Sequence, residues 1–219
     1  MITTKERPIL FSAPMVRAIQ EGRKTVTRRV VKPWQQPKLE DDGTWFAVAQ
    51  RDRRYGFGVS GADAGECALA LAQSGCCPYG SIGDRLWGRE AWAADAQLDS
   101  VAPRDLSSGE PIHYPADGVT RISGCSMISA GRIRPSIHMP RWACRILLEI
   151  TAVRVERLQD ISEEQSEAEG VYFLRVAPDF DETLTAKQLY EILWDYINGK
   201  GAWDANPWVW VVEFKRVTP

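Results

Sequence analysis

A lysine and a threonine three residues apart are the side chains in this sequence whose types and spacing first suggest catalysis. Lys24 and Thr27 lie in the stretch 21–29, Glu-Gly-Arg-Lys-Thr-Val-Thr-Arg-Arg. A threonine hydroxyl attacks a carbonyl carbon only after a base has taken its proton, and a lysine becomes such a base when burial disfavours its ammonium form. In a regular strand the two side chains would point to opposite faces. They converge only if the segment begins as a turn, so a surface lysine and an ordinary strand threonine remain open alternatives.

Other common catalytic patterns do not occur in the sequence. It contains no G-x-S-x-G, Walker or HExxH motif, and its histidines are His113 and His138, which disfavours histidine-based acid–base chemistry. The five cysteines include the adjacent Cys76 and Cys77 but no C-x-x-C pair. This spacing favours neither a zinc site nor a disulfide framework. We therefore expect an activity that needs no metal and no cofactor.

Several helix and strand signals flank the lysine–threonine pair and must position it. A short helix is predicted between Ser12, a residue type that caps helix N-termini, and Gly22, which ends it. Residues 23–31 are rich in β-branched side chains and predict a turn into a strand. Further strands are predicted near 85–92, 142–158 and 208–217, and capping-box patterns at 162–165 and 185–188 predict two more helices, ended by Gly170 and Gly199.

This order of elements predicts an α+β fold. Strands outnumber helices without a βαβ rhythm, which favours a small β-barrel flanked by short helices within one domain, 1–219. Residues 34–82 and 95–135 are rich in turn-forming residues, so we expect two insertions with weak secondary structure at the periphery of the barrel. Four tryptophans on the predicted strands are expected in the core: Trp87, Trp92, Trp208 and Trp210.

The charge distribution limits the partners that we expect. The net charge of −2 argues against a protein that coats nucleic acid through phosphates alone. Residues 17–32 and 131–145 are nevertheless locally basic, which suits a small anionic ligand or a limited nucleic-acid contact, although solvated faces would look the same. No apolar run is long enough to cross a bilayer, and the N-terminus carries no secretory pattern. We expect a cytoplasmic protein without membrane contact.

Four segments of the chain resemble the opening, middle and end of the ASCH domain family: 8–29, 83–87, 146–151 and 211–215. That family shares the PUA-like fold, so the resemblance implies a PUA-like barrel. Over its full length the chain resembles the longer, phage- and prophage-borne members of the family. This match is carried by Cys-Pro-Tyr-Gly at 77–80, His-Met-Pro-Arg-Trp-Ala at 138–143 and Trp-Asp-Ala-Asn-Pro-Trp at 203–208.

Residues 9–29, 83–89, 145–171 and 207–217 also resemble the small bacterial N4-acetylcytidine amidohydrolases of the same family. Those enzymes use a lysine and a threonine in a Gly-x-Lys-Thr-x-Thr stretch, which here implies Lys24 and Thr27 as catalytic residues. The resemblance implies a third catalytic residue, Glu169, at the end of the short helix that follows Ser162. Glu167 is the alternative, because that helix holds several glutamates and the choice depends on its register. The implied roles are base, nucleophile and acid toward the departing exocyclic nitrogen.

Candidate binding residues are Arg28, Arg141 and Trp142, which could meet a sugar, a phosphate or the face of a base. Glu90 could pair with Arg89 or face the pocket. The expected ligand is a small modified nucleoside, with RNA as a further contact, and the chain is expected to be a monomer. Two other functions stay open at this point: a module that binds RNA or a modified base without chemistry, and a ribonuclease.

Overall fold

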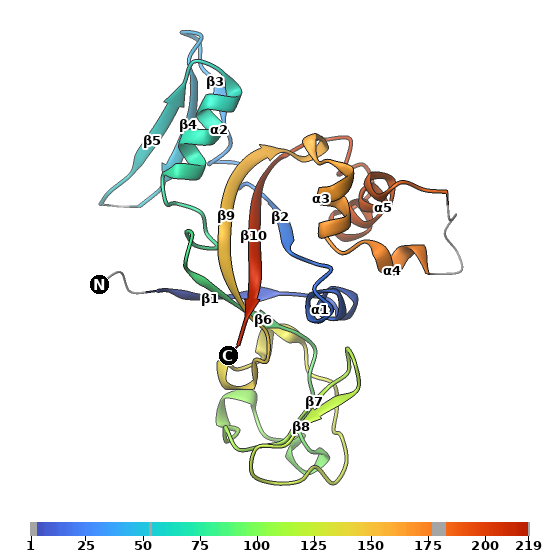
Figure 1. Ribbon diagram of the computed structural model, residues 1–219. Helices are drawn as coiled ribbons and strands as arrows, with labels where there is room; N and C mark the ends of the chain where they lie inside the picture. The colour runs from blue at the N-terminus through green and yellow to red at the C-terminus, as the bar shows by residue number, and fades with distance from the viewer. Residues whose placement is uncertain (1–3, 53, 177–182, 219) are drawn as a thin grey trace. The chain divides into compact units, whose positions relative to one another are not determined.

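The computed structural model describes residues 4–52, 54–176 and 183–218, and contacts within the chain divide it into two compact units. Unit 1 takes its residues from 1–22, 85–149 and 216–219, and unit 2 from 23–84 and 150–215. Each unit therefore draws on separate stretches of the sequence. Figure 1 labels the elements of both.

The largest sheet has five strands in the order β1-β6-β9-β10-β2. Their bounds are β1 Glu6–Leu10, β2 Val26–Val30, β6 Arg85–Arg89, β9 Leu147–Arg157 and β10 Trp208–Val217. β1 and β6 are parallel, whereas β6 pairs antiparallel with β9 and β10 pairs antiparallel with β2. The fold is thus mixed α and β. The strand pairings of the described residues give an open order with β1 and β2 at its ends, and no closed barrel is found among them.

Residues 34–82 contain more regular structure than their composition predicts. Three strands, β3 Lys38–Leu39, β4 Trp45–Gln50 and β5 Phe57–Gly61, form an antiparallel sheet of their own, and helix α2 (Ala64–Gln73) packs against β4 and β5. The prediction of weak secondary structure is wrong here. The helix buries Cys67, Ala68 and Leu71, and a Cβ at Gly61 would overlap the backbone nitrogen of Cys67. Glycine and alanine therefore serve close packing in this segment rather than irregularity.

Residues 95–135 are rich in loops, as their composition predicts. They hold a two-stranded antiparallel sheet of β7 (Ile112–Tyr114) and β8 (Val119–Arg121), with short 3₁₀ turns at η1 (Ala96–Leu98) and η2 (Pro103–Asp105). Two more turns follow, η3 (Ser136–His138) and η4 (Arg141–Ala143). Neither this segment nor 34–82 contributes a described strand to the five-stranded sheet.

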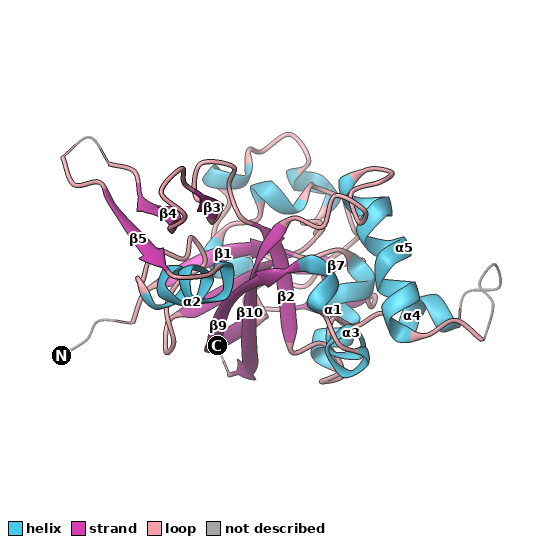
Figure 2. Ribbon diagram, turned by 90° about the horizontal axis from the view of Figure 1, so that it is seen from above, coloured by secondary structure: helices cyan, strands magenta, loops and turns pink. Residues whose placement is uncertain are grey.

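The helices follow the predicted caps closely. Helix α1 (Ala13–Gln20) begins after Ser12, although the serine side chain makes no capping hydrogen bond. Helix α3 (Glu163–Ala168) and helix α5 (Ala186–Asn198) both begin with complete capping boxes, and α4 (Tyr172–Arg175) lies between them in sequence. Helices α3 and α5 contact each other and lie side by side in Figure 1, and Figure 2 shows the helices from above, in cyan.

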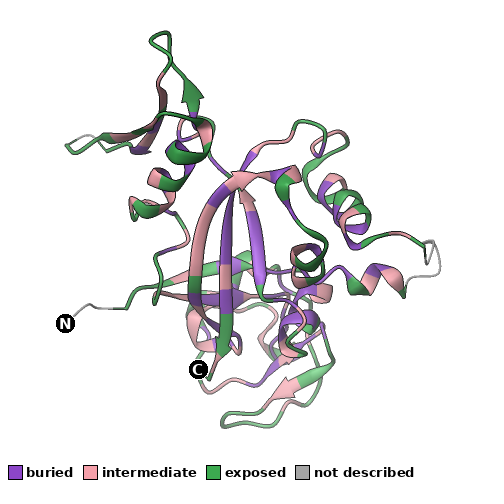
Figure 3. Ribbon diagram, turned by 45° about the horizontal axis from the view of Figure 1, so that its top comes forward, coloured by how far each residue is buried: buried purple, intermediate pink, exposed green. Residues whose placement is uncertain are grey.

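Buried side chains concentrate on the strands of the sheet. The first five residues of β10 are buried, as Figure 3 shows along that strand. The four tryptophans predicted in the core are all buried, Trp92 and Trp210 completely, and Trp92 lies beyond β6 in a cluster with Leu106 and Ile112. All five cysteines are free thiols. In the part of the chain that the structure describes, no helix has the length and apolar character needed to span a membrane.

Candidate functional site

A buried ion pair between Lys24 and Glu169 forms the centre of the candidate site in unit 2. The Lys24 Nζ atom lies 2.7 Å from the Glu169 Oε2 atom, and each residue exposes only 4% of its surface. The same ammonium donates to the carbonyl oxygens of Val26 and Glu169, each at 2.8 Å. Its three N–H groups are therefore all engaged by oxygen acceptors.

Local chain geometry brings these two residues together. After α1 the chain turns at Gly22, whose φ of 74° is a left-handed conformation that glycine adopts without strain. Lys24 thus precedes β2 instead of lying on it, so the segment does begin as a turn. Glu169 is the C-cap of α3 and is followed by Gly170 at φ 84°. The Thr25 N–H donates to the Ala168 carbonyl at 2.9 Å, which fastens the end of α3 beside the start of β2.

The structure distinguishes the two glutamates that the sequence leaves as alternatives. Glu169 faces Lys24, whereas the Glu167 carboxylate is exposed and accepts a hydrogen bond from Arg175 at 2.8 Å. Two residues apart on one turn of helix, the side chains point in different directions. Glu169, and not Glu167, therefore shares a buried site with the lysine.

Arg28 connects the Lys24–Glu169 pair to two further acceptors. Its Nη2 atom donates to Glu156 at 2.7 Å and to the Gln165 side chain at 2.6 Å, and its Nη1 atom lies 3.4 Å from Glu169. Gln165 also completes the capping box of α3, so one amide oxygen both starts that helix and holds the guanidinium. The Arg28 Nε atom is buried without a hydrogen-bond partner among the described residues. The guanidinium is a fixed positive charge close to Glu169.

Tyr190 from α5 closes the other side of the Glu169 carboxylate. Its hydroxyl donates to Glu169 Oε1 at 3.4 Å, and its ring packs against Trp194 and Trp203. Burial raises the pKa of Tyr190 well above 10, and the negative charge of Glu169 adds to that rise. The hydroxyl therefore stays protonated and remains a donor at neutral pH.

Thr27 is completely buried and has a different partner. Its Oγ1 atom accepts a hydrogen bond of 2.8 Å from Arg29 Nη1, as expected for side chains two apart on one face of β2. Arg28 alternates to the other face. No hydrogen bond among the described residues joins the Thr27 hydroxyl to Lys24 or Glu169, although Lys24 Nζ lies 2.8 Å from the carbonyl oxygen of the neighbouring Val26.

Burial and charge act in opposite directions on Lys24. Desolvation lowers the pKa of Lys24 below its ordinary 10.5, the Glu169 carboxylate raises it in part, and the cationic Arg29 and Arg28 lower it further. The net direction is downward. A lysine in this environment reaches its neutral, basic form more easily than a lysine in water, which is a requirement for a general base.

The remaining predicted binding residues belong to unit 1 and have partners within it. Glu90 is buried, and both its oxygens accept hydrogen bonds from Arg145 at 2.7 Å, so it pairs with that residue and not with Arg89. Arg141 donates to Glu6 at 2.9 Å. Trp142 is half-buried beneath the guanidinium of Arg121, which lies 5.6 Å from the ring centre. Glu90, Arg141 and Trp142 thus each have their own partner within unit 1.

Two residues of the unit 2 site, Tyr190 and Arg29, were not predicted from the sequence. Tyr190 lies within the helix predicted after Thr185, and nothing local in the sequence marks its contact with Glu169. Arg29 lies within the locally basic stretch 17–32, which is the signal that could have identified it. Its hydrogen bond to Thr27 makes it a candidate for stabilising charge on that oxygen.

Chemically, the site offers a lysine with a lowered pKa, a carboxyl group in direct contact with it, and a hydroxyl held by a guanidinium. Among the described residues no group of three His, Cys, Asp or Glu side chains has a metal-binding arrangement. Searches against protein families, curated proteins and solved structures found no match for the chain.

Proposed function

We propose that the protein is an amidohydrolase that removes the acyl group from N4-acylated cytidine or cytosine nucleosides. The observation that carries the proposal is the buried contact of 2.7 Å between Lys24 and Glu169. The proposal also assigns the chain to the ASCH family that it resembles, with a PUA-like fold. A base and an acid in contact, away from water, are two of the groups that can catalyse amide hydrolysis.

The Lys24–Glu169 contact suits proton transfer within a dry site. In the proposed mechanism Lys24, whose ammonium form is disfavoured by burial, passes a proton across the 2.7 Å contact to Glu169. The two nearby guanidinium groups oppose a third positive charge on Lys24. After this transfer the lysine is a base and the glutamic acid is a proton donor.

In the proposed reaction, neutral Lys24 takes the proton of the Thr27 hydroxyl, and Oγ1 attacks the acyl carbon. The carbon–N4 bond then breaks, and Glu169 gives its proton to N4 so that the cytosine leaves as a neutral amine. Water next attacks the threonine ester, which releases the carboxylic acid and restores the hydroxyl. Arg29, which already donates to Oγ1, would stabilise negative charge on that oxygen.

The first test is incubation of the pure protein with N4-acetylcytidine, with and without a chelator, followed by chromatography for cytidine. We expect cytidine in both cases. RNA binding without turnover would support a binding module instead, and cleavage of RNA without release of cytidine would support a ribonuclease. Loss of turnover with chelator and its recovery with added zinc or magnesium would contradict the mechanism.

The second test asks which groups react. Glu169→Gln should lower kcat/KM by about 10²–10⁴-fold, whereas the exposed Glu167→Gln is a matched control on the same helix and should stay near the parental value. Thr27→Val keeps the shape of the side chain without the hydroxyl and should lose turnover, while Thr27→Ser should retain part of it. Parental rates for a folded Thr27→Val variant would indicate direct attack by water, with Lys24 as its base.

A further inference from the structure

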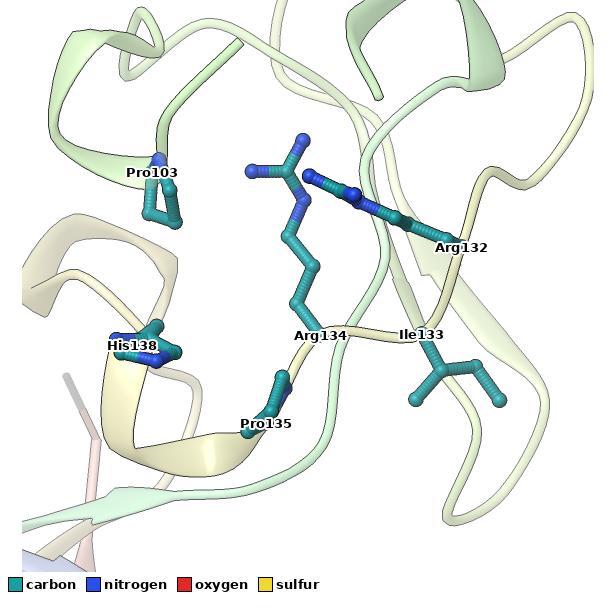
Figure 4. A pocket seen from close by; sticks show the side chains of 6 residues that line it. All are labelled: Pro103, Arg132, Ile133, Arg134, Pro135 and His138. Atoms are coloured by element: carbon teal, nitrogen blue, oxygen red, sulfur yellow. The ribbon is translucent and has the colours of Figure 1, made fainter. Parts of the chain in front are cut away.

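Unit 1 contains a basic cavity whose lining residues take no part in the proposed reaction. Its volume is about 340 Å³, within the range of sites for small organic ligands. It is lined by Pro103 of η2, by residues 132–135 and by His138 of η3. Figure 4 shows Arg134 extending into it, with Pro103 and His138 on one side and the Arg132 guanidinium directed toward that of Arg134 on the other.

The lining holds two guanidinium groups and an imidazole but no carboxylate. Arg134 is 3% exposed, and its Nη atoms donate to the carbonyl oxygens of Leu98 at 2.7 Å and Val101 at 2.8 Å. Carbonyl groups fix the guanidinium but do not neutralise its charge. Desolvation and the neighbouring Arg132 lower the pKa of Arg134, and the Asp99 carboxylate raises it in part. One carboxylate offsets only part of the charge of two guanidinium groups, so a further anion close by is favoured.

Arg132 is free to meet such an anion. Its side chain is exposed and forms no ion pair or hydrogen bond among the described residues. Its backbone N–H, in contrast, is held by the Asp99 carboxylate at 3.0 Å. A Cβ on the preceding Gly131 would overlap that carboxylate, so glycine is needed for the chain to pass this close. The backbone that carries Arg132 is therefore fixed, while its guanidinium remains available.

We propose that this cavity binds the phosphate group of a nucleotide. A phosphate monoester carries nearly two negative charges and three acceptor oxygens, which match the charge of Arg132 backed by Arg134 and the ring N–H of His138. One guanidinium group can bind two such oxygens at once. Pro103, Ile133 and Pro135 supply an apolar surface against which the sugar or base can lie. This inference does not depend on the amidohydrolase proposal, because its residues all lie in unit 1.

The test is calorimetric titration of the whole protein with cytidine 5′-monophosphate and with cytidine, which differ only in the phosphate. We expect at least a tenfold lower Kd for the monophosphate, with inorganic phosphate competing for the site. Arg132→Gln should remove most of that difference, because a hydrogen bond to a charged group contributes about tenfold or more in affinity. His138→Gln should remove a smaller part. Arg104→Gln, next to Pro103 but outside the lining, is the matched control and should change nothing.

A short RNA with and without a terminal phosphate identifies the source of the phosphate. Tight binding of the phosphorylated RNA alone indicates a strand end, and tight binding of the mononucleotide alone indicates a free nucleotide; both agree with the proposal. Equal affinity for cytidine and its monophosphate, or an unchanged Kd in the folded Arg132→Gln variant, would refute it. The titration measures binding and not turnover. If the protein fails to release cytidine from N4-acetylcytidine, the amidohydrolase proposal is wrong, but the result of the titration still stands.

Discussion

Removing Lys24 and Glu169 together should destabilise the protein less than the sum of the two single removals. In Lys24→Met the Glu169 carboxylate stays buried with only the longer contacts to Arg28 and Tyr190, each at 3.4 Å. In Glu169→Gln the buried ammonium keeps two carbonyl acceptors but loses its counter-ion. Breaking a buried ion pair on one side costs about 3–5 kcal/mol, because the remaining charge has lost its compensation.

The double variant removes both charges, so its loss of stability should be smaller than the sum of the single losses by about 2–3 kcal/mol. The assay is urea unfolding followed by tryptophan fluorescence, analysed as a double-mutant cycle. For a chain of this length each single variant should also lower Tm by roughly 6–20 °C. Lys38→Met, on the exposed strand β3, serves as the control and should stay within about 0.5 kcal/mol of the parent.

Additive losses in this cycle would show that the two side chains do not interact in solution. A Lys24→Met variant as stable as the parent would refute the argument more directly. It would mean that the carboxylate is solvated or protonated without cost, and that the site is open to water. The proposed dry proton transfer would then lose its physical basis.

Three further predictions concern pH, the second ion pair and helix packing. Burial lowers the pKa of Lys24 below 10.5, so between that lowered pKa and 10.5 the unfolded chain binds more protons than the native one. The unfolding free energy of the parent minus that of Lys24→Met should therefore increase as pH rises through this window, and a difference that falls with pH would contradict the shift. Glu90→Gln leaves Arg145 with Asp117 as its remaining carboxylate partner and should cost about 1–3 kcal/mol in urea unfolding, whereas an unchanged midpoint would show a solvated pair. Gly61→Ala should cost about 1–3 kcal/mol by forcing α2 away from β5, while Gly56→Ala, whose Cβ would have an ordinary contact at 3.4 Å, should not; equal midpoints would place α2 further from the sheet.

Local sequence signals predicted the elements around the site well. The capping boxes at Ser162 and Thr185, the glycines that end α1 and α3, and the final strand all form where their residues indicate. Each of these signals acts within a few residues, through a cap, a left-handed glycine or an alternating apolar pattern. Interactions between residues close in the sequence are therefore sufficient to place these helix ends and this strand.

In the segment 34–82 local sequence signals did not predict the secondary structure. Its glycines and alanines have the composition of loops, yet β3, β4, β5 and α2 form a small layer of their own. The close approach at Gly61 is a contact between two elements, and composition cannot distinguish a glycine needed for packing from one needed for a turn. The open strand order of the five-stranded sheet likewise follows from pairings between distant strands.

By itself the sequence determined where Lys24, Thr27 and the glutamates of α3 lie along the chain, and that a turn after Gly22 must precede the strand. Only the tertiary structure decided which glutamate faces the lysine, since Lys24 and Glu169 are 145 residues apart and their contact depends on how the end of α3 meets the start of β2. It also decided that Tyr190 and Arg28 close around that carboxylate, and that Thr27 has Arg29 as its partner. Local propensity fixes backbone conformation over a few residues, whereas desolvation and charge pairing arise only when distant segments exclude water together.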